Sequence, residues 1–443
     1  MNIQLSDHFT YKKLLRFSVA PIVMMVLTSI YGVVDGLFVS NFVGKTAFAS
    51  LNLIYPYIML IGGAGFMIGT GGSALVAKTL GEGKRATANR YFTMLVIFII
   101  IFGAVLAALG IIFIRPVAYK LGATEAMIEN CVNYGRIVLG FNVAFMLQNA
   151  FQTFFITAEK PELGLMTTIT AGLTNVMLDA LFIAVFEWGI EGAALATGLS
   201  QCVGGVLPII YFLLSKKSLL RFTKTRLELR PIVKACTNGV SELMANVSGA
   251  TVSMLYNFQL MRFAGENGVA AYGVIMYVEF IFVATFIGYA ISAAPIVAYH
   301  YGAENHDELK NILRKSVVLT LGTGTVMMLL AQLSASVLAK IFVGYDSELF
   351  AMTNHALRIF SLAFVLSGIN IYASSFFTAL NNGAVSAVIS FMRTLVFQLL
   401  SVLILPIFFG IDGIWSAIVV AEVFALIISS IFLITKRKKY HYM

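Results

Sequence analysis

Apolar residues occur in stretches of about 20 residues or longer along the whole chain, separated by short segments rich in charges and turn residues. Stretches of that length are typical of membrane-spanning helices, because a helix needs about 20 apolar residues to cross the hydrocarbon core. Charge and turn residues divide the chain into about twelve such spans. We place them at residues 17–42, 50–77, 92–114, 131–157, 164–186, 192–214, 236–262, 269–298, 316–342, 354–380, 384–408 and 413–435.

Composition supports a membrane protein. Of the 443 residues, 59% are hydrophobic and only 12% are charged, whereas soluble domains contain roughly 25% charged residues. A soluble protein of this size would have too few polar residues to cover its surface. No polar stretch is long enough to fold alone as an aqueous domain. The sequence therefore predicts an all-α integral membrane protein with twelve transmembrane helices.

Basic residues are concentrated between particular spans. The formal net charge is +9, but the Lys and Arg residues form short clusters between apolar stretches and not the continuous stripe of a nucleic-acid-binding protein. With a cytoplasmic N-terminus, cytoplasmic segments carry about 22 of the 30 basic residues. This asymmetry predicts a multi-pass protein of the cell membrane with both termini in the cytoplasm, without a nucleic-acid partner.

An internal repeat relates the two halves of the chain. The segment "VGKTAFASL" (43–51) matches "AGENGVAAY" (264–272), and "WGIEGAALA" (188–196) matches "FGIDGIWSA" (409–417). Both matches have the same offset along the chain, which carries position 43 to position 264, and we call this offset the repeat shift. The repeat predicts a six-helix lobe over 1–214, a basic cytoplasmic linker over 215–234 and a second six-helix lobe over 235–443. Since six is even, both lobes have the same orientation, and a cavity is expected between them.

Five acidic residues lie inside spans, where an unpaired charge is unfavourable and a functional role is the default hypothesis. They are Asp35, Asp179, Glu242, Glu279 and Glu422. Asp35 lies about 28 Å beyond Arg16, and Asp179 lies about 12 Å before Glu187 at the other end of its span. These depths agree.

Asn175 lies one helical turn from Asp179 and faces the same way. Burial and a neighbouring carboxylate both disfavour the charged form, so the acid pair is expected to bind a proton or a small cation. The alternative is that each acid only forms a hydrogen bond with a neighbouring helix.

The second half differs in its charged residues. The repeat shift places Tyr256 opposite Asp35, so the acid pair is not repeated. Glu242 and Glu279 are candidates for a second ion site or a substrate site, with a helix–helix hydrogen bond as the alternative. Arg393 is expected to be structural, either paired with a carboxylate across the cavity or reaching toward the headgroups. Helix packing is the expected role of Glu422.

Enzyme chemistry has no support in the sequence. The glycine-rich "GGAGFMIGTGGSA" (62–74) lacks the Gly-Lys-Ser/Thr ending of a phosphate-binding loop and is more typical of close helix packing or a bend in a membrane. No Ser/His/Asp, Cys/His or metal-ligand pattern occurs, so we expect no catalytic residue, no cofactor and no metal beyond a possible Na⁺. The three cysteines are expected to be small buried residues.

The chain resembles the multidrug and toxic compound extrusion (MATE) transporters. "FSVAPIVMMVLTSIYGVVDGLFVSNFVGKTAFASLNL" (17–53) is similar to their first helix, and "GTGGSALVAKTLGEGKRATANR" (69–90) to their second helix and the following loop. "NVMLDALFI" (175–183) and "GIEGAALATGLSQ" (189–201) are similar to the fifth and sixth helices. The resemblance covers both halves of the chain.

This resemblance implies an antiporter that exports organic cations by alternating access, driven by H⁺ or Na⁺. In the branch with an acid pair in the first lobe, the ion-binding residues fall on Asp35, Tyr134, Asn175, Asp179 and Thr197. In the branch with a sodium site in the second lobe, the acid of the seventh helix falls on Glu242. That branch also has an acid in the tenth helix, which span 354–380 lacks, and Glu279 is then the candidate substitute.

The sequence therefore predicts a monomeric exporter of amphipathic, mostly cationic compounds in the lipid bilayer. Protonation of the acid pair is expected to bend span 17–42 near Pro21 or Gly32. The main alternative is a flippase or exporter of a lipid-linked or polysaccharide precursor, which needs a cationic cavity for anionic headgroups. A structural or receptor-like membrane protein fits the two-lobe repeat poorly.

Overall fold

The computed structural model describes residues 3–215 and 217–443, apart from the side chains at positions 33, 37 and 45. The elements of the first half are α1 (Tyr11–Phe38), η1 (Val39–Val43), α2 (Lys45–Gly81), α3 (Arg85–Lys120), α4 (Glu125–Gly140), α5 (Asn142–Thr157), α6 (Pro161–Asp179), η2 (Ala180–Val185) and α7 (Gly189–Leu214). Those of the second half are α8 (Leu229–Gly302), α9 (His306–Val343), α10 (Ser347–Phe360), η3 (Ser361–Ala363), α11 (Phe364–Ala379), α12 (Gly383–Phe391), η4 (Met392–Phe397), α13 (Gln398–Phe409) and α14 (Ile411–Tyr440).

The described residues contain the predicted number of membrane crossings. Ten helices are long and apolar enough to cross a membrane, and α4 with α5 forms an eleventh crossing that bends by 56°. Helix α8 is two helices joined at Gly265, whose φ of 61° and ψ of −148° break the helical geometry. It therefore supplies two crossings, which brings the described total to twelve.

The expected span over residues 131–157 is not a single helix. Residues 131–157 are divided between α4 and α5, with the break at Phe141. The side chain of Asn142 donates a hydrogen bond to the carbonyl of Gly103 at 3.0 Å, which fixes the first turn of α5 against α3. The short η3 interrupts the corresponding span of the second half at 361–363. The repeat shift carries 140–142 onto 361–363, so an interruption of the regular α-helix at this position occurs in both halves of the repeat, although only α4 and α5 are sharply bent.

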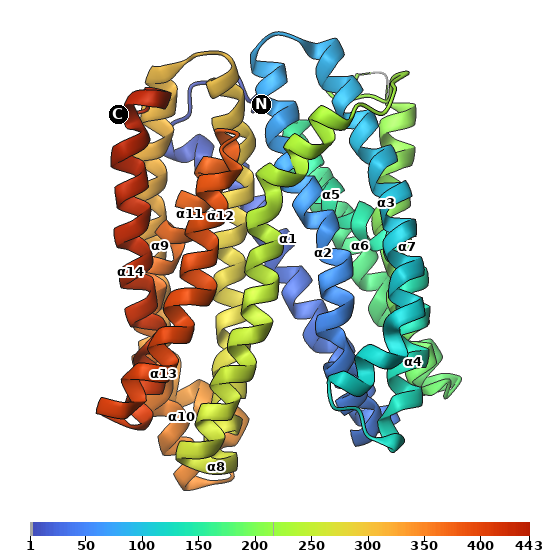
Figure 1. The fold of residues 1–443 in the computed structure, drawn as a ribbon, viewed down its shortest axis with the longest axis vertical. Coiled ribbons are helices and arrows are strands. Elements are labelled where there is room, and N and C mark those ends of the chain that lie inside the picture. The colour runs from blue at the N-terminus through green and yellow to red at the C-terminus, as the bar shows by residue number, and fades with distance from the viewer. Residues whose placement is uncertain (1–2, 216) are drawn as a thin grey trace.

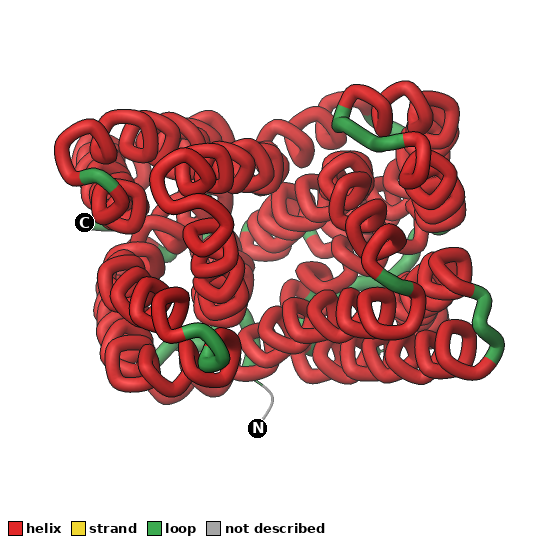
Figure 2. Tube along the Cα trace, turned by 90° about the horizontal axis from the view of Figure 1, so that it is seen from below, coloured by secondary structure: helices red, strands yellow, loops and turns green. Residues whose placement is uncertain are grey.

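The helices form two groups (Figures 1 and 2). Helices α1–α7 make the first lobe and α8–α14 make the second, as the repeat predicts. Both termini lie at the same end of the molecule (Figure 1). We call this end the N/C end and the opposite end the far end.

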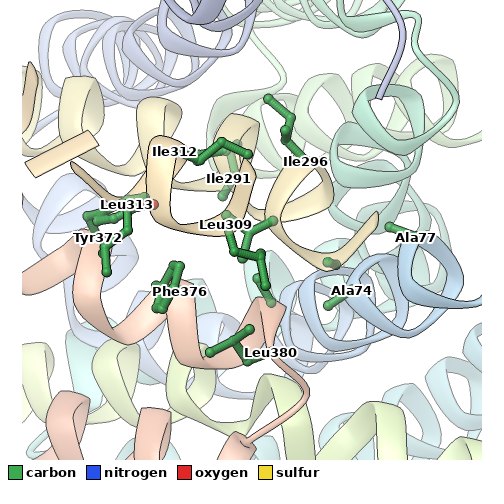
Figure 3. Packing of buried hydrophobic residues seen from close by; sticks show 14 of the residues in the cluster. Ala74, Ala77, Ile291, Ile296, Leu309, Ile312, Leu313, Tyr372, Phe376 and Leu380 are labelled. Carbon is green, nitrogen blue, oxygen red and sulfur yellow. The ribbon is translucent and has the colours of Figure 1, made fainter. Parts of the chain in front are cut away.

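Among the described residues, the buried apolar clusters that join the two lobes lie toward the N/C end. The cluster in Figure 3 joins Ala74 and Ala77 of α2 to α8, α9 and α11 of the second lobe. It also includes Leu5 and Phe9 of the N-terminal segment. At the far end, the buried cluster around Ile54 contains described residues of the first lobe only, and the cluster around Trp415 contains residues of the second lobe only.

Close backbone contacts join the lobes at the same end. A Cβ atom on Gly71 of α2 would overlap the backbone of α8 at Ala235 and Gly239. The hydroxyls of Ser18 on α1 and Ser292 on α8 form a hydrogen bond of 2.6 Å. The repeat shift carries Gly71 onto Ser292 and Ser18 onto Gly239. The two contacts are therefore equivalent under the repeat, and together they close the N/C end.

The linker between the lobes packs along α3. The backbone N–H of Arg221 donates to Asn89 at 3.0 Å, and that of Thr223 donates to Thr93 at 3.0 Å. The ring of Phe222 stacks on Phe92 with 5.1 Å between centroids. The described part of this segment is therefore fixed to the first lobe.

Candidate ion and substrate site

The two acids of the first lobe face each other from α1 and α6. Asp179 is the last residue of α6 and is fully buried. Asp35, one turn before the end of α1, is half-buried. Their carboxyl groups are close enough to interact electrostatically. The tertiary structure thus brings together two acids that lie far apart in the chain.

A glycine on α6 permits this approach. The ring of Tyr31 on α1 occupies the space that a Cβ atom on Gly172 would fill. Asp35 lies one turn beyond Tyr31, and Asp179 lies about two turns beyond Gly172. Since both helices run from the N/C end toward the far end (Figure 1), the contact between Tyr31 and Gly172 sets the register in which the two acids meet.

Other predicted residues complete the cluster. Tyr134 of α4 is buried and lies near both acids and near Thr197 of α7. Asn175 is buried one turn before Asp179 on α6. Sequence reasoning missed Tyr55 of α2, which interacts with Asp35 and Tyr134. Its sequence signal is weak: a tyrosine directly before Pro56 within an apolar helix.

Several polar atoms of this cluster lack a hydrogen-bond partner among the described residues. They are both carboxylate oxygens of Asp179, Oδ1 of Asp35 and Oγ1 of Thr197. The ion pairs of the described residues involve neither acid. A buried carboxylate without a partner is strongly unfavourable in its ionised form. The cluster is therefore chemically suited to hold a proton or a small cation.

Helices lose their regular hydrogen bonding beside these charges. Asp179 is followed directly by the π-helical segment η2, and Asp35 is followed four residues later by the π-helical η1. In the second lobe, Arg393 lies inside the π-helical η4. Such segments displace a side chain relative to the regular helix and occur often at functional positions.

Glu422, a fully buried acid of the second lobe, is paired. Arg393 contacts Glu422 of α14 through Nη2 at 2.8 Å and Nε at 2.9 Å. The amide of Asn370 on α11 donates to the other carboxylate oxygen of Glu422 at 2.6 Å. Arg393 therefore pairs within its own lobe. Glu422 has the same burial as Asp179, but its charge is compensated.

Two further acids surround Arg393. Glu242 and Glu279 are half-buried and lie within electrostatic range of its guanidinium group. Tyr256 stacks on Tyr272 with 4.9 Å between ring centroids, and both rings lie near Glu279. The structure thus places the three candidate residues of the second lobe around one network, without the close acid pair of the first lobe. Their role as an ion or substrate site stays a prediction.

The hinge candidates lie in a continuous helix. Helix α1 passes through Pro21 and Gly32 without a break. The carbonyl of Pro21 lies against Gly288 of the other lobe, whereas a Cβ atom on Gly32 would meet nothing within 4 Å. Bending at either residue therefore stays a prediction.

The glycine-rich stretch in α2 packs helices together. Cβ atoms added to Gly65 and Gly69 would overlap the backbone of α5 at Met146 and Ala150. Two residues after Gly69, Gly71 contacts the second lobe. Small residues at this spacing let membrane helices approach closely, as the sequence predicted.

Known proteins share this arrangement. The MatE family model matches residues 21–181 and 243–404, once in each lobe. The multidrug export protein MepA of Staphylococcus saprophyticus is 21% identical over 432 residues, covering 94% of this chain and 92% of its own. The probable multidrug resistance protein YoeA of Bacillus subtilis is 24% identical over 367 residues, covering 81% and 79%.

A solved structure described as the outward-facing conformation of a multidrug resistance MATE family transporter of the MOP superfamily has the same fold. Its TM-score is 0.93 at 21% identity, and the match covers 100% of this chain and 99% of that one. Together with the family match in both lobes, which spans more than half of the sequence, this establishes that the chain is a membrane transporter that belongs to the MatE family.

Proposed function

We propose that the protein is a secondary antiporter that exports organic, mostly cationic amphipathic compounds in exchange for H⁺ or Na⁺. One observation carries the proposal: Asp35 and Asp179 meet in the first lobe with three carboxylate oxygens that no described residue satisfies. A group that binds a proton or a small cation there can couple an ion gradient to transport. The similarity to MepA, a multidrug export protein, and to YoeA, a probable multidrug resistance protein, supports multidrug export.

The proposed orientation follows from charge. The basic segments lie at the N/C end, which we assign to the cytoplasm. The lobes share apolar packing at this end and have separate cores at the far end. The structure then corresponds to an outward-open state, in which substrate leaves and the coupling ion enters from outside.

Helix α1 links the ion site to the lobe contact. Asp35 lies on α1 toward the far end. Ser18 lies on the same helix toward the N/C end and forms a hydrogen bond with Ser292 of the other lobe. Binding of an ion changes the charge at Asp35, and bending of α1 near Pro21 or Gly32 transmits that change to the contact. Exchange requires that ion and substrate have different affinities for the two conformations.

The charges of the second lobe favour cationic cargo. Glu242 and Glu279 are half-buried acids, whereas the nearby Arg393 is already paired with Glu422. An exporter of lipid-linked precursors, the alternative, needs unpaired basic groups to hold an anionic headgroup. We therefore expect organic cations to stimulate counter-ion uptake and anionic lipid-linked sugars to have no effect.

Efflux from proteoliposomes tests the proposal, with a pH gradient and a Na⁺ gradient imposed separately. We expect one of the gradients to drive export of a cationic dye, and Asp35→Asn and Asp179→Asn each to abolish gradient-driven export. Glu187→Gln is the matched control, because Glu187 is an exposed acid beyond the far end of the same span as Asp179. Full gradient-driven efflux by Asp35→Asn would contradict the mechanism.

A further inference from the structure

A cavity of about 300 Å³ opens at the N/C end, away from the ion site. It lies where α2 ends, α3 begins and α8 begins. Its lining residues are Leu75, Lys78, Thr79, Glu82, Lys84, Thr87, Tyr91 and Lys234. Three of these side chains are lysines and one is an acid, so the lining carries a net positive charge.

Glu82 is the single carboxylate of this lining, and two of the lysines share it. Its carboxylate lies 2.9 Å from Lys84 Nζ and 3.7 Å from Lys78 Nζ. Burial raises the pKa of Glu82, but the hydrogen bond from Lys84 and the charge of Lys78 outweigh burial and lower it. Glu82 is thus ionised at neutral pH and offsets one positive charge.

Lys234 has no such partner. The ion pairs of the described residues do not include it, although it lies near enough to Lys78 to be repelled and near enough to Glu82 to be attracted. Two net positive charges therefore face the cavity. The three lysines line this space from three parts of the chain: Lys78 from α2, Lys84 from the residue before α3, and Lys234 from α8.

Helix α3 adds to the positive character of the cavity. Its first turn contains no acid, and no side chain caps it. Thr87, in that first turn, lines the cavity, so the start of α3 lies beside it. The start of a helix attracts anions through its N–H groups and the helix dipole, and the Thr87 hydroxyl supplies a further hydrogen-bond donor.

The cavity lies on the boundary between the lobes. Lys78 and Lys84 belong to the first lobe. Lys234 belongs to the second, because α8 begins at Leu229 and includes the last residues of the linker that the sequence predicted. Lys78 also lies over the ring of Tyr301 in the second lobe, 5.0 Å from its centroid. Lys234 directly precedes Ala235, whose carbonyl contacts Gly71 across the interface. An anion in the cavity would therefore bind both lobes when their N/C ends are in contact.

We propose that this cavity binds a phosphate group, supplied by the headgroup of an anionic lipid in the leaflet at the N/C end, and that this lipid stabilises the contact between the lobes. A phosphate carries the charge and the acceptor oxygens that three lysines, a hydroxyl and a free helix start can satisfy. The apolar spans begin at this level, where lipid headgroups lie, and basic pockets between membrane helices bind such headgroups.

Thermal unfolding of the purified full-length protein tests the site without any transport assay, so its result is independent of the proposed antiport. The protein is placed in vesicles of phosphatidylcholine with or without phosphatidylglycerol, and a separate sample in detergent receives inorganic phosphate. We expect phosphatidylglycerol to raise the unfolding temperature. Lys84→Gln and Lys234→Gln should each weaken lipid affinity about fivefold. Lys310→Gln is the control, an exposed lysine at the same end outside the cavity.

The outcomes separate the alternatives. Loss of the lipid effect in both cavity variants but not in Lys310→Gln supports the proposal. Equal stabilisation by inorganic phosphate, lost in the same variants, overturns the lipid source and leaves a site for soluble phosphate. An undiminished response in Lys234→Gln, or an equal loss in Lys310→Gln, overturns the site itself. Because all three positions are exposed to solvent, we expect the variants to fold.

Discussion

Gly81 of α2 and Gly302 of α8 form a reciprocal contact between the lobes. A Cβ atom on Gly81 would overlap the carbonyl of Tyr299, and a Cβ atom on Gly302 would overlap the carbonyl of Lys78. The repeat shift carries Gly81 onto Gly302 and Lys78 onto Tyr299. The pseudo-two-fold axis of the repeat therefore passes between these helix ends, where backbone meets backbone.

Alanine at Gly81 or Gly302 should weaken closure of the N/C end. The added methyl group meets a backbone carbonyl that cannot rotate away, so the helices must separate, at a cost of about 1–3 kcal/mol. We expect a lower unfolding temperature and greater accessibility of the N/C end to a membrane-impermeant thiol reagent at a cysteine introduced there. Gly249→Ala, on a helical site with nothing within 4 Å, should leave both unchanged.

Alanine at Gly172 should separate the acid pair. The new methyl group overlaps the ring of Tyr31 and pushes α1 away from α6, so gradient-driven efflux should fall at least about tenfold, equivalent to about 1.4 kcal/mol. The double variant Tyr31→Ala with Gly172→Ala removes the overlap and should recover part of the activity. Absence of any recovery would show that Tyr31 has a role beyond spacing.

The two buried acids should respond differently to substitution. The substitution Arg393→Met leaves the Glu422 carboxylate buried without its cationic partner. This should cost about 3–5 kcal/mol of folding free energy. Asp179→Asn removes a charge that has no partner, so we expect no loss of stability, only loss of ion coupling. Thermal unfolding of both variants in one detergent distinguishes these outcomes. The double variant Arg393→Met with Glu422→Gln should recover stability relative to Arg393→Met.

Glu159 should make the attachment of the N-terminal segment depend on pH. This residue lies in the loop after α5, and its Oε1 accepts a hydrogen bond from the N–H of Leu5 at 2.7 Å. Burial raises the pKa of Glu159, although the Leu5 hydrogen bond opposes the shift. The ionised form is therefore disfavoured in the folded protein, and stability should increase as the pH falls through the raised pKa.

Substitutions at Glu159 separate charge from hydrogen bonding. Glu159→Gln keeps the acceptor without the charge, so it should be at least as stable as the native protein at neutral pH, with the difference vanishing in acid. Glu159→Ala loses the hydrogen bond and should cost about 1 kcal/mol. Unfolding midpoints measured across the acidic to neutral range test both expectations. If Glu159→Gln is less stable than the native protein at neutral pH, the predicted direction of the pH dependence is wrong.

Much of the architecture was predictable because lipid imposes simple rules. Apolar length predicts each crossing, and repeat matches such as 43–51 with 264–272 reveal two lobes. Acids such as Asp35 stand out because an ionised group is costly in hydrocarbon. The break at Phe141 was not predictable, since no proline or charge marks it and it depends on packing against α3.

The sequence by itself determined the crossings, the repeat and the presence of unusual buried charges, since these follow from local composition and from the cost of polar groups in lipid. Only the tertiary structure decided which charges are satisfied. It pairs Glu422 with Arg393 inside one lobe and leaves Asp179 beside Asp35. That difference depends on how closely helices approach, which glycines such as Gly172 control through contacts with residues far away in the chain.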